Sequence, residues 1–506
     1  MIFLHHHHPY VSLGCAEYKV VGWNTYTLIE QAARVPVGSF EYDFSRSGRR
    51  QVIDMLDAAA AAGFNTVRTW AYSVGKHQSL QTSPGVYHEP LFQGLDWVVY
   101  QAAARGIRLL LVFTDYWEYN GGVAQYLDWS GSLAPSKNSF FSDQRCKAMY
   151  KANVKRVIER VNAYTGVTYR DDPTIMAWEL INEPRCRNCA GRLQQWIEEM
   201  AKYVKSLDAN HLLSTGEEGF YTAGSRGNVE ANPEMWALTT GQDFIANHDV
   251  PEIDFAVAHL WPDNWGVFSV GGSLGDDFSA EWIRAHTRDA QDILGKPFVL
   301  EEFGATGAGS AAMVVGGGGG GGVVGDYFSS SSSSSSSYSQ QAERARRSDA
   351  VARYYRRVYN QVERASADGR AMQGSMFWTW HHEDLKSVAL PIDDYAIFLG
   401  DAVFAEARRH ASVMRGGVTA KSLRACGSTR FTGDDTDDGG GGGGYLEEAA
   451  ERQQQQGRGG GIFGLSRIFA DGDGAADDGD GGGGGGGLFF PSQILQPPCL
   501  FGRLFC

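Results

Sequence analysis

WELINEP (Trp178–Pro184) and PFVLEEFG (Pro297–Gly304) are the two runs that best indicate the fold of this chain. Each begins as a short apolar segment typical of a buried parallel strand. Each ends near a carboxylate, Glu183 in the first run and Glu302 in the second, with a chain-breaking residue close behind. Functional side chains of β/α barrels stand just past the carboxyl ends of the strands, so the two runs predict a barrel with two acids at its mouth.

Strand-like and helix-like segments alternate from about Tyr18 to Arg424. The strand candidates are Lys19–Trp23, Thr66–Ala71, Arg108–Phe113, Ile175–Leu180, His211–Thr215, Phe255–His259, Phe298–Glu302 and Ser375–Trp378. The helix-like stretches between them are Gln51–Ala62, Gln93–Arg105, Cys146–Tyr164, Leu193–Leu207, Ala280–Leu294 and Gln341–Ala367. Eight strands that alternate with helices are the pattern of a (β/α)₈ TIM barrel, which is the fold class that we expect.

Composition divides the chain into three parts. Residues 1–15 form an N-terminal segment, residues 16–424 form the barrel, and residues 425–506 form a tail with poly-Gly, Asp-rich and Gln runs. A Gly/Ser-rich insertion at about 313–340 interrupts the barrel. Because such stretches cannot bury apolar surface, we expect a flexible surface insertion and a disordered tail. The apolar end of the tail is either a docking peptide or the product of an uncertain reading frame.

Charge and hydropathy exclude some classes of partner. The net charge of −14 argues against nucleic acid and anionic membranes. No stretch approaches the roughly 20 apolar residues of a membrane span. Aromatic residues make up 12% of the chain, and flat rings suit a cleft for sugars, although most of them belong to an ordinary core.

The seven cysteines leave at least one thiol unpaired in a monomer, the state that we expect. Cys186 and Cys189 are the only close pair, and without a second pair a zinc site is disfavoured. A local disulfide is the preferred interpretation, and it implies a secreted protein in an oxidising compartment. The first residues lack a proper signal peptide, so either the start is truncated or export follows another route.

Paired carboxyl groups are what the cleavage of a glycosidic bond requires. One group stays protonated to donate to the leaving oxygen, while the other is ionised. The fourth and seventh strands of a barrel lie across its mouth from each other, so Glu183 and Glu302 can face one another. In a retaining enzyme the two groups are roughly 5 to 5.5 Å apart, and the charge of each raises the pKa of the other.

The order of the motifs along the chain is specific. The motifs are NTVRTWAYS (Asn65–Ser73), WELINEPRC (Trp178–Cys186), VAHLWPDNW (Val257–Trp265), LEEFG (Leu300–Gly304) and MFWTW (Met376–Trp380). This order resembles glycoside hydrolase family 5, and most of all its endo-β-1,4-mannanase branch of plants and fungi. The resemblance spans about Lys19 to Trp380 and implies a reaction that needs no metal and no organic cofactor.

The resemblance implies a role for individual residues. Glu183 matches the acid/base and Glu302 the nucleophile, while Asn182 would hydrogen-bond the 2-hydroxyl of the sugar at the cleavage point. Arg68 resembles the arginine that keeps the nucleophile ionised, with a structural salt bridge as the alternative. Glu301 would then point away from the site, because side chains alternate along a strand.

Other residues match the family's substrate cleft less closely. His259 matches a cleft histidine, although a packed histidine is the alternative, and Trp378 matches the aromatic platform under the sugar. Trp70, Trp117 and Glu218 are weaker candidates for substrate binding, each open to a structural interpretation.

One position departs from the family pattern. Many members carry His-x-Tyr on the sixth strand, where the Tyr hydroxyl bonds the nucleophile, and here the residue is Trp261. An indole N–H donates one hydrogen bond and cannot accept, so Trp261 could still hold an ionised carboxylate. We expect activity to survive with an altered pKa of the nucleophile.

The resemblance therefore implies a retaining endo-acting enzyme that cleaves internal β-1,4-mannosidic bonds in mannans. A β-1,4-glucanase of the same family stays open, since mannose differs from glucose only in its axial 2-hydroxyl. A non-catalytic carbohydrate-binding barrel is the third candidate. The combination of Glu183, Glu302, Arg68 and Asn182 argues against it, because binding alone does not need paired acids.

Overall fold

The computed structural model describes residues 2–4, 11–13, 16–34, 47–75, 79–118, 120–132, 136–267, 273–306, 337–369, 371–385 and 395–416. All of them belong to the unit Met1–Arg430, and the unit Phe431–Cys506 lies outside the described residues. The predicted tail, residues 425–506, is therefore outside them as well. Most of the predicted insertion at about 313–340 also lies outside the described residues, and its last residues, 337–340, belong to the helix Ser337–Ala367.

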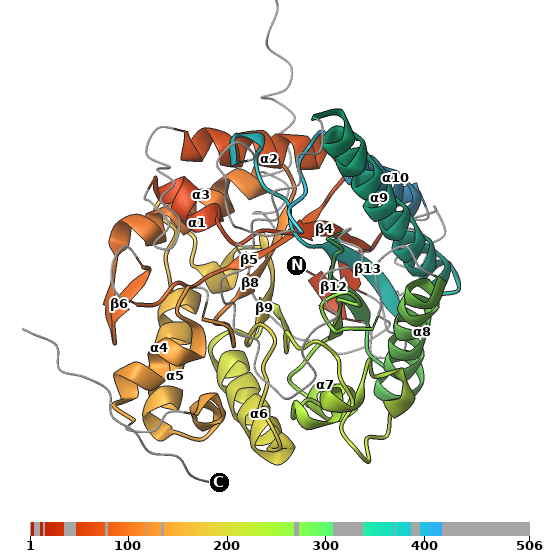
Figure 1. The fold of residues 1–506 in the computed structure, drawn as a ribbon. Coiled ribbons are helices and arrows are strands. Elements are labelled where there is room, and N and C mark those ends of the chain that lie inside the picture. The colour runs from red at the N-terminus through yellow and green to blue at the C-terminus, as the bar shows by residue number, and fades with distance from the viewer. Residues whose placement is uncertain are drawn as a thin grey trace, which may run out of the picture. The chain divides into compact units, whose positions relative to one another are not determined.

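Eight parallel strands form the barrel, which Figure 1 shows along its axis. The strands are β4 (Val20–Asn24), β5 (Thr66–Trp70), β8 (Arg108–Val112), β9 (Ile175–Glu179), β10 (Leu212–Ser214), β11 (Ala256–Leu260), β12 (Phe298–Phe303) and β13 (Met372–Phe377). They pair in the order β10-β9-β8-β5-β4-β13-β12-β11. The predicted TIM barrel is confirmed, and each predicted strand is present with small differences at its ends.

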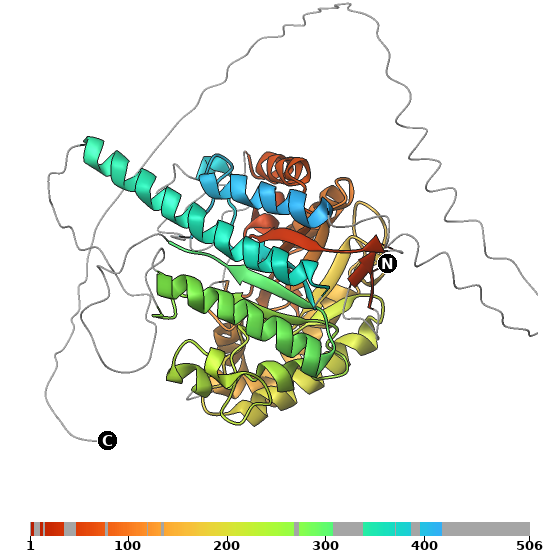
Figure 2. The same cartoon turned by 90° about the vertical axis from the view of Figure 1, so that its right-hand side faces the viewer.

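Helices surround the barrel on its outer side (Figure 1). They are α1 (Leu28–Ala33), α2 (Gly48–Ala62), α3 (Glu89–Ala103), α4 (Gly122–Ser130), α5 (Gln144–Ile158), α6 (Ala190–Leu207), α7 (Phe244–His248), α8 (Ser273–Asp289), α9 (Ser337–Ala367) and α10 (Ala402–Gly416). Figure 2 shows α8, α9 and α10 side by side along one flank. The segment Ala290–Leu294 continues α8 as a π-helix, so the predicted helix Ala280–Leu294 covers the end of α8 and this extension.

The strands are buried on both faces. Every residue of β4, β5, β9, β10, β11, β12 and β13 is buried. One face packs inside the barrel and the other against the helices, so such strands have apolar runs rather than an alternating pattern. These apolar runs are the reason why the strands could be predicted from the sequence.

Helix α5 ends at Ile158, earlier than the prediction that carried it to Tyr164. The Oδ1 atom of Asn162 accepts the backbone N–H groups of Tyr164 at 2.8 Å and Thr165 at 3.3 Å. Gly166 has a φ of 71°, which suits a turn and not a helix. The asparagine side chain thus offers the backbone a turn in place of a further helical turn.

Side chains bridge the junction between β10 and β11. Among the described residues no ladder joins these two strands, which stand at opposite ends of the pairing order. The N–H of Leu213 donates to Oδ2 of Asp254 at 2.7 Å, and the N–H of Val257 donates to Nε2 of His248 at 3.2 Å. Thr215 contacts the same imidazole nitrogen through its hydroxyl at 2.9 Å. We call this group of contacts the β10–β11 junction.

Two small antiparallel sheets accompany the barrel. One contains β1 (Ile2–Leu4), β2 (Val11–Leu13) and β3 (Ala16–Glu17), and the other contains β6 (Gln81–Ser83) and β7 (Val86–Tyr87). Within the part of the chain that the structure describes, no helix combines the length and the apolar content that a membrane span requires.

Candidate active site

The two predicted glutamates lie at the carboxyl ends of barrel strands. Glu302 is on β12, the seventh strand of the barrel, and Glu183 follows β9, the fourth. Glu183 has a φ of 48°, which residues other than glycine rarely adopt. Its N–H donates to the carbonyl of Gly216 at 2.7 Å, so the loop after β10 supports this backbone conformation.

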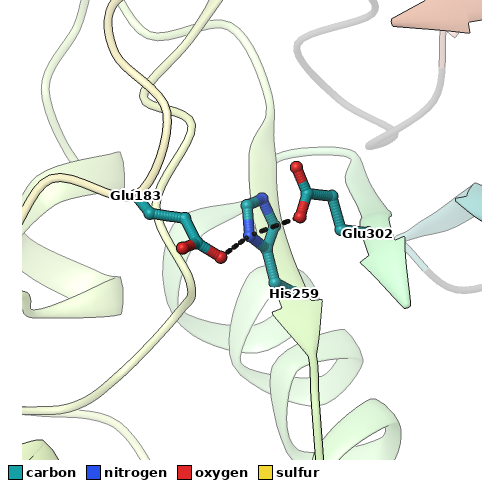
Figure 3. A group of neighbouring side chains, drawn as sticks. All are labelled: Glu183, His259 and Glu302. Carbon is teal, nitrogen blue, oxygen red and sulfur yellow. Dashed lines mark hydrogen bonds and ion pairs between the residues drawn. The ribbon is translucent and has the colours of Figure 1, made fainter. Parts of the chain in front are cut away.

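His259 on β11 stands between the two carboxyl groups (Figure 3). Its Nδ1 lies 2.8 Å from Oε1 of Glu183 and 3.4 Å from Oε2 of Glu302. One ligand atom of each of the three side chains lies within 4.8 Å of the other two. Burial lowers the pKa of His259 to about 3, so the imidazole is neutral. The two carboxyl groups thus face each other beside one neutral ring.

The guanidinium of Arg68 on β5 binds Glu302 and the polar side chains around it. Arg68 is fully buried, and its five N–H groups have five acceptors. Nε and Nη2 donate to Glu179 at 2.8 and 2.6 Å, Nη1 donates to Asn24 at 3.0 Å and to Glu302, and Nη2 donates also to Asn182 at 2.7 Å. The guanidinium therefore connects β4, β5, β9, β12 and the loop after β9.

Burial raises the pKa of both catalytic candidates. At Glu302 the charge of Arg68 opposes this rise and the charge of Glu183 adds to it. At Glu183 the opposing groups are Arg185 and Trp117, whose indole N–H donates to Oε2 of Glu183 at 2.5 Å. Two acids this close titrate as a coupled pair, so they hold one proton between them over a broad range of pH.

Aromatic rings form one wall beside the carboxyl groups. Trp378, directly after β13, stacks on Tyr26 with the ring centroids 5.6 Å apart and an angle of 21°. Trp70 lies 6.0 Å from Trp378, and the guanidinium of Arg68 lies 4.8 Å from the Trp70 ring. Such rings can stack on the apolar face of a sugar. The structure therefore brings the predicted residues Trp70 and Trp378 together beside the carboxyl groups.

Glu218 lies on the other side and is bound by an arginine that the sequence analysis missed. Arg185 donates to both carboxyl oxygens of Glu218, with Nε at 2.8 Å from Oε2. The Arg185 guanidinium lies over the rings of Trp117, Phe220 and Trp236 at 5.2, 5.7 and 5.3 Å. The position of Arg185 directly after the motif NEP was the sequence feature that could have indicated a role in the site.

Residues 14–402 match the model of a protein family described as GH family 5 beta-mannosidase-like, in which GH stands for glycoside hydrolase. The chain belongs to this family. It is 43% identical over 290 residues to mannan endo-1,4-beta-mannosidase 8 of Oryza sativa subsp. japonica, a match that covers 56% of this chain and 75% of that protein. The identity to mannan endo-1,4-beta-mannosidase 7 of Arabidopsis thaliana is also 43%, over 298 residues that cover 58% of this chain and 66% of that protein.

Solved structures agree with the family assignment. The endo-beta-1,4-mannanase from Thermotoga petrophila superposes with a TM-score of 0.61 at 27% identity and covers 80% of this chain and 78% of that chain. The endo-1,4-beta-mannanase from Rhizomucor miehei has a TM-score of 0.62 at 23% identity, and the superposition covers 82% of this chain and 99% of that chain. This second likeness supports the fold. The resemblance to glycoside hydrolase family 5 is confirmed, and the protein is a glycoside hydrolase.

The prediction that Glu301 points away from the site in this family 5 barrel is wrong. The pairing of β11 with β12 shifts so that Ala258 faces Leu300 while His259 faces Glu302, which leaves Glu301 as the extra residue of a β-bulge. At the bulge both acidic side chains turn toward Arg68. Nε of Arg68 lies 3.7 Å from Oε1 of Glu301, which is fully buried.

Trp261 does not take over the hydrogen bond of the family's tyrosine. Among the described residues its side chain contacts rings: Tyr395 at 4.8 Å and Trp378 at 6.3 Å between centroids. The indole lies so close to Gly304 that a Cβ there would meet its Cζ3 at 2.6 Å. Trp261 therefore contributes to the aromatic wall, while Glu302 accepts a hydrogen bond from Arg68 and lies 3.4 Å from Nδ1 of His259.

The predicted disulfide between Cys186 and Cys189 is present, with the Cα atoms 5.2 Å apart. It closes the loop directly after the motif NEP. Of the other cysteines, Cys146 is a buried thiol, and the rest lie outside the described residues.

Two further polar residues of the site escaped the sequence analysis. Asp115 accepts a hydrogen bond from Nδ2 of Asn182 at 3.1 Å, and burial raises its pKa to about 7. Glu179 is the last residue of β9 and binds Arg68. Each stands at the end of a predicted strand, which was the signal available for finding it. Within the described residues, Glu183, His259 and Glu302 are also close enough to one another to be candidates for holding a metal ion.

Proposed function

We propose that this protein is a retaining endo-β-mannanase, in which Glu302 is the nucleophile and Glu183 the acid/base. The observation that carries the assignment is the separation of the two groups. An oxygen of Glu183 and an oxygen of Glu302 lie within 4.8 Å of each other. This suits the roughly 5 to 5.5 Å of retaining enzymes and leaves no room for the water that an inverting enzyme places between its carboxyl groups.

The hydrogen bonds support this division of roles. Glu302 accepts a charge-assisted hydrogen bond from Arg68, which favours its ionised form. Among the described residues Glu183 accepts no hydrogen bond from a guanidinium, and the charges of Arg185 and Arg68 act on it only through space. The single proton of the pair therefore belongs on Glu183. Glu183 protonates the leaving oxygen while Glu302 attacks the anomeric carbon and forms a glycosyl ester. Glu183 then removes a proton from water, which attacks the anomeric carbon and releases Glu302.

The residues around the pair support substrate binding. Asn182 uses Oδ1 for Arg68 and one N–H for Asp115, which orients its amide and leaves the second N–H for a sugar hydroxyl. Trp378 offers a ring for the sugar at the cleavage point. The mannan specificity is inferred from the names of the relatives in rice and Arabidopsis. The disulfide near the site supports an oxidising, extracellular compartment.

Product analysis tests the assignment. The purified protein is incubated with linear mannan, glucomannan and carboxymethyl cellulose, and the products are identified by mass. We expect a ladder of manno-oligosaccharides from mannan and no products from the cellulose derivative. Equal turnover of cellulose would show a glucanase, and absence of turnover on all three substrates would show a binding protein.

A mechanism-based inhibitor tests the nucleophile directly. A 2-deoxy-2-fluoro-mannoside with a good leaving group slows the second step, so the ester accumulates. We expect the label on the peptide that contains Glu302, and no label in Glu302→Gln. A label on Glu301 or Glu183 would contradict the assignment. The matched control is Glu183→Gln, which keeps the nucleophile and should still be labelled, because a good leaving group needs no proton.

A further inference from the structure

Two buried groups without a hydrogen-bond partner face each other behind the catalytic pair. Both carboxyl oxygens of Glu301 and Nε2 of His259 have no partner among the described residues. Oε2 of Glu301 lies 3.6 Å from this Nε2. Both side chains are fully buried. Buried polar groups are nearly always paired, so a close pair of unpaired ones needs an explanation.

Arg68 cannot supply the missing partner of Glu301. The nitrogen closest to Glu301 is Nε at 3.7 Å, and its only N–H donates to Glu179. The other four N–H groups donate to Asn24, Glu179, Asn182 and Glu302. A buried carboxylate that accepts no hydrogen bond is strongly unfavourable. Glu301 therefore carries a proton.

The surrounding charges lead to the same protonation state. The groups that face Glu301 and His259 are Arg68 on β5, Glu179 on β9, Glu183 and Arg185 after β9, Glu218 after β10, and Glu302 on β12. Arg185 is already paired with Glu218, so Arg68 alone balances the remaining carboxyl groups. Burial, with the charge of Glu179, raises the pKa of Glu301 well above its usual range.

Glu179 and His259 are the two candidate acceptors for the proton of Glu301. Both oxygens of Glu179 already accept from Arg68, whereas Nε2 of His259 has no partner among the described residues, which favours His259. His259 is neutral, so its ring has one N–H and one lone pair. With a lone pair on Nε2, the ring accepts from Glu301 and carries its hydrogen on Nδ1. Nδ1 is the nitrogen that faces both Glu183 and Glu302 (Figure 3). In the opposite tautomer Nδ1 carries a lone pair, which could bond Oε1 of Glu183 at 2.8 Å only by accepting the proton that the acid/base must deliver to the leaving oxygen.

We propose that Glu301 is a positioning residue: as a neutral carboxylic acid it donates its proton to Nε2 of His259 and so fixes the tautomer whose Nδ1–H serves the catalytic pair. The 3.6 Å separation shortens by a small rotation of the carboxyl group, as catalytic hydrogen bonds do when substrate binds. This inference rests on the proposed function, since the fixed tautomer matters through its hydrogen bond to the acid/base Glu183, beside Glu302. Orientation of a histidine by a neighbouring carboxyl group is a general device of active sites.

Two variants of similar volume separate this role from others. Glu301→Gln keeps a neutral donor, and we expect kcat on mannan within about threefold of the wild type and an unchanged pH profile. Glu301→Met keeps an unbranched side chain without a donor, and we expect kcat to fall by about 10- to 100-fold with a shifted pH profile. Thermal melting verifies that both variants fold.

The tautomer is read directly by NMR of the full chain labelled with ¹⁵N-histidine, with His259→Gln to assign the signal. We expect Nδ1 to be protonated in the wild type and in Glu301→Gln, and Nε2–H to appear in Glu301→Met. Three results would overturn the inference: Nε2–H in the wild type, a loss in Glu301→Gln as large as in Glu301→Met, or no effect of Glu301→Met on either readout. If the wild type does not cleave mannan, the proposed function fails, while the NMR result still decides the tautomer.

Discussion

Arg68 and Glu302 are joined by a hydrogen bond from Nη1 to Oε1 at the mouth of the barrel. The same guanidinium binds Glu179 through two nitrogens and supports Asn182 and Asn24. Glu302 therefore shares its cation with a second carboxylate. This explains why the position requires the planar, five-donor side chain of arginine.

Replacement of this arginine by lysine tests that requirement. Lysine carries three donors at one point, so Arg68→Lys should leave at least two buried acceptors unpaired. We expect kcat/KM on mannan to fall by at least about 100-fold. Loss of the bond to the ionised form also raises the pKa of Glu302, so the acid limb of the pH profile should move to higher pH. An acid limb that stays in place would mean that Arg68 is only structural.

The acid/base assignment predicts a dependence on the leaving group. Glu183→Gln should lower the turnover of mannan by about 10²- to 10⁴-fold, because the glycosidic oxygen must be protonated. An aryl mannoside with an acidic phenol leaves without a proton, so its first step should stay fast. Steady-state and burst measurements on both substrates check this difference, and equal losses would contradict the role.

The disulfide should stabilise the loop after Glu183 by a modest amount. Cys186 and Cys189 are three positions apart, and so short a closed loop removes little entropy from the unfolded chain. We expect Cys186→Ala/Cys189→Ala to lose about 2 kcal/mol of unfolding free energy, measured by urea denaturation. The single substitution Cys146→Ala, at the buried thiol, tests how much of the loss reflects packing. A loss in the double variant no larger than the packing loss would show that the crosslink itself contributes nothing.

The β10–β11 junction predicts a pH dependence of stability. Burial lowers the pKa of His248 to about 3, whereas an unfolded chain takes up this proton below about pH 6.5. The contribution of neutral His248 is therefore complete above about pH 6.5 and is lost as the pH falls toward 3, by up to about tenfold in the unfolding equilibrium per pH unit. The stability difference between wild type and His248→Gln should shrink over this range.

Neighbouring groups require a matched control for that measurement. Glu217 lies 3.2 Å from Nδ1 of His248, and Lys296 donates to the His248 carbonyl at 2.5 Å. Thr215→Val alters the same junction and removes no titratable group. Because folded His248 stays neutral well above pH 3, the effect of Thr215→Val on urea unfolding should be independent of pH down to that region. Parallel pH curves for His248→Gln and the wild type would refute the linkage.

The sequence revealed most of the fold because parallel strands are buried on both faces. Segments such as Ile175–Glu179 are continuous apolar runs that end on a polar residue, so their positions are local information. The end of α5 was missed because the side chain of Asn162 competes with the helix through its own backbone contacts. A periodicity argument does not detect such competition.

The site was predicted as far as single motifs determine it. Glu183, Glu302, Arg68 and His259 come together, since strand ends of a barrel share one face. The predicted orientation of Glu301 was wrong because the true one depends on the register between β11 and β12. That register is set by strand pairing and not by the alternation of side chains within one strand. The bond between Arg185 and Glu218 likewise joins segments after different strands.

The many bonds of Arg68 have a consequence for folding kinetics. Its acceptors come from β4, β9, β12 and the loop after β9, so they assemble only when the first, fourth and seventh strands of the barrel have come together. Partly folded chains therefore lack the ion pair between Arg68 and the nucleophile Glu302. During refolding, hydrolytic activity should return with the final closure of the sheet and not with the earlier gain of helix, which makes turnover a reporter of the completed barrel.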